Sequence, residues 1–347
     1  MKAIFVMLLM LKAVSVKTLP EFKSSKEPDN KARADDVTDD ITLEYRPEIL
    51  RRNLIKLFNL TAQDLELSYE TIWPGGRSTI TLKRTRGKSG DKKLLDVPQV
   101  TTGEKSDQKS ATQSRGTTHK LQAKRVIIPP DERKQLPSSS KAQKSPHSAA
   151  CKVSCKGFCT WSCSGTLIGP HHVLTSAHCI DGVDVATLQV GFLERNGRLQ
   201  WYDVMKASMP LRWKITKKKY DYAVLKLKGR ANRRSYVSVV SVSLPKNSLI
   251  SITGFPGDKS PSSLWISKCR AILVSSGQIW NNCDVVRGSS GSGVLVKDNS
   301  GGITRTVVVG VLSGEQSVRI RGRVKRFNVA VHLTGSKLSQ INEWINK

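Results

Sequence analysis

Three short segments of the chain carry the side chains that a nucleophilic hydrolase needs. His178 follows an apolar run and adjoins Cys179, Asp221 immediately precedes another apolar run, and Ser290 lies in the Gly/Ser-rich turn 288–293. A serine hydroxyl is a weak nucleophile, so it needs an adjacent base such as histidine, which a third group must in turn orient. These residue types predict covalent catalysis if the fold brings them together.

The sequence around His178 resembles a motif of the trypsin/chymotrypsin-like serine proteases. The run Cys163-Ser164-Gly165-Thr166-Leu167-Ile168 is followed by Thr175-Ser176-Ala177-His178-Cys179, which is similar to the Thr-Ala-Ala-His-Cys string of that family. A disulfide between Cys163 and Cys179 would hold His178 at the end of a strand, within reach of its nucleophile. The resemblance implies that His178 is the general base.

That family orders its catalytic residues His, Asp, Ser, and this chain offers the same order. The string Asp221-Tyr222-Ala223-Val224-Leu225 resembles the family's Asp-Ile-Ala-Leu-Leu, which implies that Asp221 orients the imidazole. A surface acid at the start of a strand is the alternative. Asp184 and Asp203 are weaker candidates, because no alternating strand pattern follows either of them.

The turn Gly288-Ser289-Ser290-Gly291-Ser292-Gly293 resembles the family's Gly-Asp-Ser-Gly-Gly-Pro string. This implies that Ser290 is the nucleophile and that the amides of Gly288 and Ser290 form the oxyanion hole. Glycine at position 288 permits the unusual backbone angle that such a tight turn requires. Ser289 and Ser292 are the competing assignments for the nucleophile.

Substrate-binding residues follow from the same resemblance. Residues 308–315 look like the family strand that walls the specificity pocket, which implies that Ser313 supports Asp221 and that Ser313, Gly314 and Glu315 pair with the substrate backbone. Asp284, six positions before the nucleophile, stands where trypsin has its pocket acid. A surface acid on a loop is the alternative, because the neighbouring cysteine is displaced from the family's spacing.

Further strings resemble a secreted branch of the family, that of serine protease 23. They are residues 188–193, Cys283-Asp284 before the Ser290 turn, and residues 327–331. That branch carries a long basic pro-region, and the resemblance covers roughly residues 150–347.

The residue before the nucleophile departs from the family pattern. In activated trypsins a new amino terminus, usually Ile-Val-Gly-Gly, pairs with an aspartate at that position and orders the oxyanion hole. Ser289 carries no charge, and the chain has no Ile-Val-Gly-Gly string. Either the loop forms without that ion pair or the enzyme is weakly active. We expect processing after Arg125, which is followed by the apolar run Val126-Ile127-Ile128.

The sequence after residue 150 is typical of an all-β protein, because short β-branched runs alternate with Gly, Pro, Asn and Asp. Such runs occupy residues 165–168, 172–175, 222–227, 250–253, 293–296 and 306–312. The resemblance implies two six-stranded antiparallel barrels of the chymotrypsin type, and residues 338–345 have the spacing of an amphipathic helix. We expect the protease domain to occupy residues 149–347.

Residues before this domain divide into three parts. A single early lysine, a short apolar stretch and small residues at Ala13 and Ser15 indicate a signal peptide at 1–15, with a buried N-terminal element as the alternative. Residues 16–82 form a pro-region with a small ordered module, in which we expect a helix at 47–58 and a strand at 78–82. Residues 83–148 form a basic, low-complexity linker, so the region before the domain is expected to be largely disordered.

Secretion would also explain the cysteines, because an oxidising compartment lets them pair. We expect two bridges, Cys163–Cys179 and Cys269–Cys283, each contributing about 3 kcal/mol in the chain-entropy model. Three cysteines then remain, Cys151, Cys155 and Cys159, so one thiol lacks a partner within the chain. A zinc site formed by the evenly spaced run Cys151, Cys155, Cys159 and Cys163 is a less favoured alternative.

The expected chemistry requires no cofactor or metal, since hydrolysis through an acyl-enzyme needs only the triad and water. Asn59 lies in the chain's Asn-x-Ser/Thr tripeptide and is a candidate glycosylation site. No apolar run reaches the roughly 18 residues that a transmembrane anchor needs. The sequence therefore favours an extracellular protein.

The chain is strongly basic, with a formal net charge of +29. Between residues 319 and 326, cations alternate with small or apolar residues, which would place positive charge along one strand face; they are Arg319, Arg321, Arg323, Lys325 and Arg326. Such a field attracts anionic polymers, here a heparin-like glycosaminoglycan, whereas nucleic acid is disfavoured without interleaved aromatic residues. A merely solvated face is the alternative.

Two functions follow from these patterns. The favoured one is a secreted serine endopeptidase that acts on a protein or peptide substrate. The other is a catalytically weak or inactive protease-fold protein that binds glycosaminoglycan or matrix.

Overall fold

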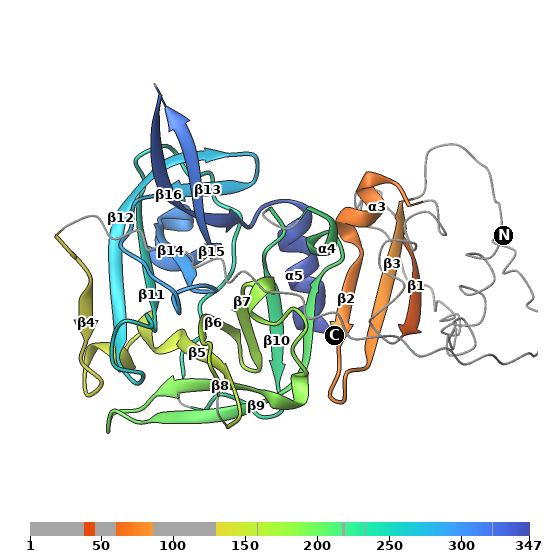
Figure 1. Cartoon of the computed structure of the whole chain (residues 1–347), viewed down its shortest axis with the longest axis horizontal. Helices are drawn as coiled ribbons and strands as arrows, with labels where there is room; N and C mark the ends of the chain where they lie inside the picture. The colour runs from red at the N-terminus through yellow and green to blue at the C-terminus, as the bar shows by residue number, and fades with distance from the viewer. Residues whose placement is uncertain are drawn as a thin grey trace, which may run out of the picture.

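The computed structural model describes residues 38–45, 60–85, 130–157, 159–216, 219–232, 234–320 and 322–347. These residues form two adjacent β-barrels with a small β-module attached to the first (Figure 1). The expected signal peptide, the helix at 47–58, Asn59 and Arg125 lie outside the described residues.

The first barrel closes from six antiparallel strands, because β8 pairs with both β5 and β9. The strands follow the ring order β8-β9-β10-β7-β6-β5. Both β6 and β7 are buried along their whole length, which suits their apolar and β-branched composition. Their bounds are β5 Ala150–Cys155, β6 Cys163–Gly169, β7 His172–Thr175, β8 Leu188–Leu193, β9 Leu199–Pro210 and β10 Ala223–Leu227.

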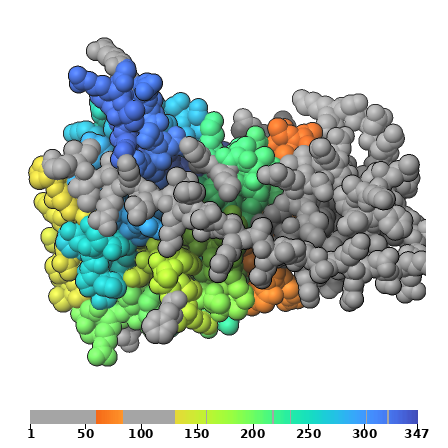
Figure 2. Space-filling view, viewed as in Figure 1, coloured from red at the N-terminus to blue at the C-terminus, as the bar shows by residue number. Residues whose placement is uncertain are grey.

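The second barrel also closes from six antiparallel strands, in the order β11-β14-β15-β16-β13-β12, with β11 pairing back to β12. The β15–β16 hairpin is long and projects from the barrel (Figures 1 and 2). The bounds are β11 Leu249–Gly254, β12 Leu264–Ser275, β13 Gln278–Asn281, β14 Gly293–Asp298, β15 Arg305–Ile320 and β16 Arg323–His332.

These two barrels confirm the fold class predicted from the sequence. Every strand-like run singled out above lies within a strand or one residue beyond it. The expected C-terminal helix is present as α5 (Ser336–Asn346), which buries Ile341 and Trp344 against the first barrel. No helix among the described residues is both long and apolar enough to span a membrane.

The remaining helices of the described residues are short. They are α3 Ala62–Leu67 and α4 Trp213–Thr216, with 3-10 turns η2 Lys141–Gln143, η3 His147–Ala149, η4 Ala177–Cys179, η5 Val185–Thr187 and η6 Ser300–Gly302.

The N-terminal module extends the sheet of the first barrel. Its strands β1 (Thr38–Tyr45), β3 (Ser78–Thr85) and β2 (Tyr69–Ile72) lie in that order, and β2 pairs with the end of β9. The strand expected at 78–82 is therefore present as part of β3. Tyr69 and Ile72 belong to the core of the first barrel, so the module is built into the domain rather than merely attached by the chain.

The folded domain begins earlier than the expected residue 149. Residues 130–148, assigned to the linker from their composition, lie on the second barrel, where β4 (Lys134–Leu136) pairs with β12. Leu136 and Ala142 are buried in a shared cluster with Phe255. A few apolar residues placed between lysines and serines are enough to anchor this segment, and composition alone obscured them.

Candidate active site

His178 and Asp221 contact each other at the ends of neighbouring strands. His178 lies in η4 directly after β7, and Asp221 precedes β10, the partner of β7. The imidazole Nδ1 lies 2.7 Å from Asp221 Oδ2, and the backbone N–H of His178 donates to Oδ1 at 2.9 Å. An ionised carboxylate requires the proton on Nδ1, so Nε2 is left as the acceptor.

The two side chains of this pair differ in their exposure to solvent. The Asp221 side chain is 3% exposed, whereas 35% of the His178 side chain is exposed. The Ser313 hydroxyl also donates to Asp221 Oδ2. The other carboxylates considered have different contacts, since Asp203 pairs with a lysine at 2.8 Å and Asp184 caps η5.

The turn that carries Ser290 requires glycine at two positions. Gly288 has a φ of +93° and Gly291 a φ of +85°, which residues with side chains rarely adopt. A Cβ atom on Gly291 would lie 2.2 Å from the Ser164 carbonyl oxygen, and one on Gly288 would lie 2.7 Å from that of Phe255. The turn therefore packs tightly against main chain on both sides.

Hydrogen bonds from both barrels hold this turn. The Ser164 amide of β6 donates to the Ser290 carbonyl at 2.7 Å, and the Gly291 amide donates to the Leu312 carbonyl of β15 at 2.8 Å. The Ser164 hydroxyl donates to the Gly288 carbonyl at 2.8 Å. The turn is thus fixed between the barrels.

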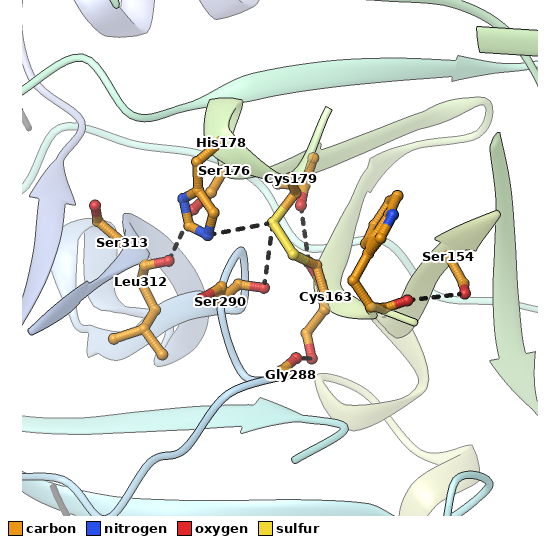
Figure 3. The surroundings of a disulfide bond; sticks show 12 residues. Ser154, Cys163, Ser176, His178, Cys179, Gly288, Ser290, Leu312 and Ser313 are labelled. Carbon is orange, nitrogen blue, oxygen red and sulfur yellow. Dashed lines mark hydrogen bonds between the residues drawn. A yellow bond between two sulfur atoms is a disulfide. The ribbon is translucent and has the colours of Figure 1, made fainter. Parts of the chain in front are cut away.

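Ser290 lies beside the His178 ring, on the same side of the Cys163–Cys179 disulfide (Figure 3). Cys179 Sγ is 3.7 Å from His178 Nε2 and 4.0 Å from the Ser290 carbonyl oxygen. A disulfide sulfur carries no hydrogen, so both are contacts at packing distance. The bridge therefore holds the imidazole and the Ser290 main chain against one sulfur atom.

The expected oxyanion-hole amides, those of Gly288 and Ser290, both lie in the turn that carries the nucleophile candidate. Among the described residues, no carbonyl or side chain accepts a hydrogen bond from either amide. Two N–H groups on one rigid turn are the arrangement that stabilises a tetrahedral oxyanion.

Sequence reasoning missed a set of buried hydroxyls behind the turn. Thr175 Oγ1 donates to the Ser164 carbonyl at 2.8 Å, and Ser176 Oγ donates to the Leu312 carbonyl at 2.8 Å. The Gly293 amide donates to Thr166 Oγ1 at 2.9 Å. Their signal was the repetition of Ser and Thr within otherwise apolar strands, where a hydroxyl needs a partner.

Asp284 is buried beside a small cavity, and its expected role as a pocket acid stays a prediction. It is 5% exposed, and its Oδ2 accepts a hydrogen bond from the Glu132 amide at 2.9 Å. Asp284 lines this small cavity together with residues that include Arg133, Trp265 and Ser289. The hydrogen bond from Glu132 shows that Asp284 also anchors the segment that leads into β4.

The segment held by Asp284 has a second anchor. Arg133 donates to both Asp131 and Asp258 at 2.7 to 2.9 Å, and its side chain is 3% exposed. The hydrogen bond from Arg133 lowers the pKa of Asp258, so this carboxylate stays ionised at acidic pH.

Both expected disulfides are present, Cys163–Cys179 and Cys269–Cys283. Cys155 pairs with Cys159, and buried Cys151 is the free thiol that the odd count implied. Burial raises the pKa of the Cys151 thiol far above its usual range. The zinc alternative fails, because three of its four sulfurs are bonded within disulfides.

The basic hairpin does not carry its cations on one face. In the register of the hairpin, Arg319 lies opposite Val324 and Ile320 lies opposite Arg323. Directly opposed residues share a face, so Arg319 and Arg323 lie on opposite faces. The expectation treated the run as one continuous strand. Arg321 lies outside the described residues.

Two closed barrels with a histidine, an aspartate and a serine between them are the arrangement of the trypsin-like serine proteases. The trypsin family model matches residues 137–334. Serine protease 23 of Bos taurus is 30% identical over 312 residues, which span 80% of this chain and 75% of that protein. The chain belongs to the trypsin family.

Other similar proteins differ in what their names state. Inactive serine protease 35 of Homo sapiens is 28% identical over 349 residues, which span 81% of this chain and 78% of that protein. A solved structure of a Glu endopeptidase in complex with MPD aligns with a TM-score of 0.51 and 23% identity, over 64% of this chain and all of that one. That likeness concerns the fold alone.

Proposed function

We propose that this protein is a secreted serine endopeptidase that hydrolyses peptide bonds of protein or peptide substrates through an acyl-enzyme. The observation that carries the proposal is the contact of His178 with buried Asp221 beside a turn with two amides that donate to no acceptor among the described residues. Family membership supports the reaction class, and the inactive relatives make catalytic activity the point to test.

Each residue has one task in this mechanism. Ser290 Oγ attacks the substrate carbonyl carbon while His178 Nε2 takes its proton, and Asp221 stabilises the resulting imidazolium. The negative charge on the former carbonyl oxygen is met by the amides of Gly288 and Ser290. Collapse expels the amine, which takes the proton from His178. Water then attacks the acyl-enzyme by the same route and releases the acid.

Labelling with a fluorophosphonate probe tests this proposal, because only an activated serine reacts. We expect the wild-type chain to label and Ser290→Ala to lose labelling. Asp221→Asn should slow labelling by several orders of magnitude, because it favours the wrong imidazole tautomer. Ser289→Ala and Ser292→Ala are matched controls from the same turn and should label as the wild type does. Absence of labelling, or labelling that survives Ser290→Ala, would overturn the proposal.

Secretion belongs to this proposal. It rests on the signal-like sequence of residues 1–15 and on three disulfides, which persist in oxidising compartments. Expression of the full chain in cultured cells, followed by blotting of medium and lysate, tests it. Removal of residues 2–15 should retain the protein in cells.

A second candidate function is a protease-fold protein without catalysis. It is favoured by relatives named inactive and by the basic hairpin. A chain that fails to label but binds a heparin column above about 0.5 M salt would support it, since such salt screens weak surface charge.

A further inference from the structure

The strand that carries Ser313 continues far beyond the catalytic centre. β15 runs to Ile320 and pairs with β16 through the whole hairpin. Ser317 and Arg319 on β15 are exposed, as is β16 from Arg323 to Arg326. Figures 1 and 2 show this hairpin projecting from the second barrel. It forms a rail that begins at the site and leads outward.

One edge of this rail has no partner among the described strands. On that side β14 pairs with β15 only between Arg305 and Val311, and the Ser290 turn adds the contacts of Leu312. From Ser313 onward only β16 pairs with β15, on the opposite side. Alternate N–H and C=O groups of the outer half of β15 therefore face outward, ready to receive an extended peptide.

The rail is positively charged on both faces. Arg319 lies on one face, while Arg323 and Lys325 lie on the other, according to the register of the hairpin. Its acid, Glu315, is paired with Arg326 at 3.4 Å and lies nearest the catalytic centre. Beyond Glu315, the charged side chains of the hairpin are all cations.

We propose that the β15–β16 hairpin binds an acidic stretch of the substrate, about four to seven residues before the scissile bond. The inference rests on the proposed function, which places the substrate beside Ser313. Residues of the peptide are counted back from the scissile bond, and the first is the residue whose carbonyl reacts. In an antiparallel peptide whose first residue lies opposite Ser313, the third residue lies opposite Glu315. The fifth then lies opposite Ser317 and the seventh opposite Arg319. Side chains at the fifth and seventh positions share a face with Arg319.

A peptide fits this surface better than a polysaccharide. An open strand edge offers main-chain hydrogen bonds, which only another polypeptide can complete. A sulfated polymer would favour cations gathered on one face, whereas this hairpin divides them between two. The two occupants also differ in an observable way, because blocking peptide N–H groups leaves charge unchanged and removes edge pairing.

Binding of fluorescent peptides to the full chain carrying Ser290→Ala tests the proposal without turnover. The first probe has Asp at the fifth and seventh positions before the bond, the second has Asn there, and the third keeps Asp but carries N-methyl groups on alternate amides. Each exposed charge pair changes affinity modestly, so we expect the Asp peptide to bind about fivefold more tightly than the Asn peptide at low salt.

Variants locate the effect on the hairpin. Arg319→Ser with Arg326→Ser, two cations on the face that the fifth and seventh side chains share, should remove the preference for Asp. The matched control is Arg195→Ser with Arg198→Ser, two exposed cations in the turn between β8 and β9, which lie on the opposite side of the barrels from the β15–β16 hairpin (Figure 1); this variant should keep the preference. N-methylation should weaken binding at least as much as loss of the two charges.

The outcomes separate this inference from the proposed function. Equal affinity for the Asp and Asn peptides overturns the inference, even if Ser290 labels with the probe. Unchanged binding of the N-methylated peptide, together with heparin binding lost in the hairpin variant, shows a polyanion surface and overturns it too. If a chain that never labels with the probe still binds the Asp peptide selectively, peptide binding by the hairpin is supported and only the proposed peptidase activity is refuted.

Discussion

Replacement of Tyr69 by alanine tests whether the N-terminal module is an integral part of the first barrel. Tyr69 lies on β2 and is 3% exposed. Its ring packs edge-on against Trp344 of α5 with centroids 5.6 Å apart, and its hydroxyl donates to Glu343 at 3.0 Å. The side chain therefore joins a segment near the start of the chain to its last helix.

The cost of Tyr69→Ala follows from this burial. Large aromatic residues replaced by alanine in a core typically cost about 3–5 kcal/mol. For a domain of this size, 1 kcal/mol shifts the melting temperature by about 2–4 °C, so we expect a fall of about 10 °C. Tyr69→Phe removes only the hydroxyl and should cost about 1 kcal/mol.

Thermal melts followed by circular dichroism provide the measurement. Tyr236→Ala is the matched control, because that side chain is 52% exposed and should change the melting temperature little. If Tyr69→Ala melts within about 2 °C of the wild type, the module does not stabilise the barrel and the reasoning is refuted.

Three further predictions follow from the structure. Cleavage between residues 86 and 129 should leave the N-terminal piece bound in native size-exclusion chromatography, and non-reducing denaturing gels should separate it because no cysteine precedes Cys151; release under native conditions contradicts this. Burial lowers the pKa of His172 to about 4, so the unfolded chain takes up a proton that the folded chain refuses and the free energy of unfolding should fall as pH drops from about 6.5 to about 4. His172→Gln should flatten this slope in urea titrations, whereas His171→Gln should keep it; equal slopes in all three proteins count against the assignment. Acetylating or extending the amino terminus created after Arg125 should leave probe labelling within a few fold, and a loss of 100-fold, about 2.7 kcal/mol, would show that an acid receives that amine.

The sequence could single out the candidate catalytic residues because their information is local. His178, Asp221 and Ser290 each sit in a string of five or more residues with a recognisable pattern, and each string begins or ends a strand. Short β-branched runs likewise indicate strands without knowledge of their partners. The fold class is confirmed, and the roles of these three residues stay a prediction.

What the sequence did not predict depends on pairing between distant segments. The contact of Tyr69 with Pro210 joins β2 to β9 across more than a hundred residues, and neither segment carries a signal for the other. The hydrogen bond from the Glu132 amide to Asp284 likewise joins two distant segments that carry no signal for each other. The faces of the basic hairpin depended on the length of one turn, because a shift of one residue reverses every side chain.

The turn at Ser290 can be formed before any processing, because its supports come from the barrels. Trypsin-type ordering needs a charged partner for a new amine, and Ser289 provides none. Burying an unpaired amine would cost several kcal/mol, so insertion is disfavoured here.

In place of the ion pair of trypsin, hydrogen bonds from main-chain and hydroxyl groups stabilise the Ser290 turn. Ser164 contributes one from its amide and one from its hydroxyl, and Leu312 and Thr166 each accept one. At about 0.5–1.5 kcal/mol each, these four bonds together stabilise the turn by several kcal/mol. None of them involves a residue before 164, so cleavage of the linker leaves all of them intact. Processing would then control access to the site or release of the domain, and the oxyanion hole would exist in the uncleaved chain.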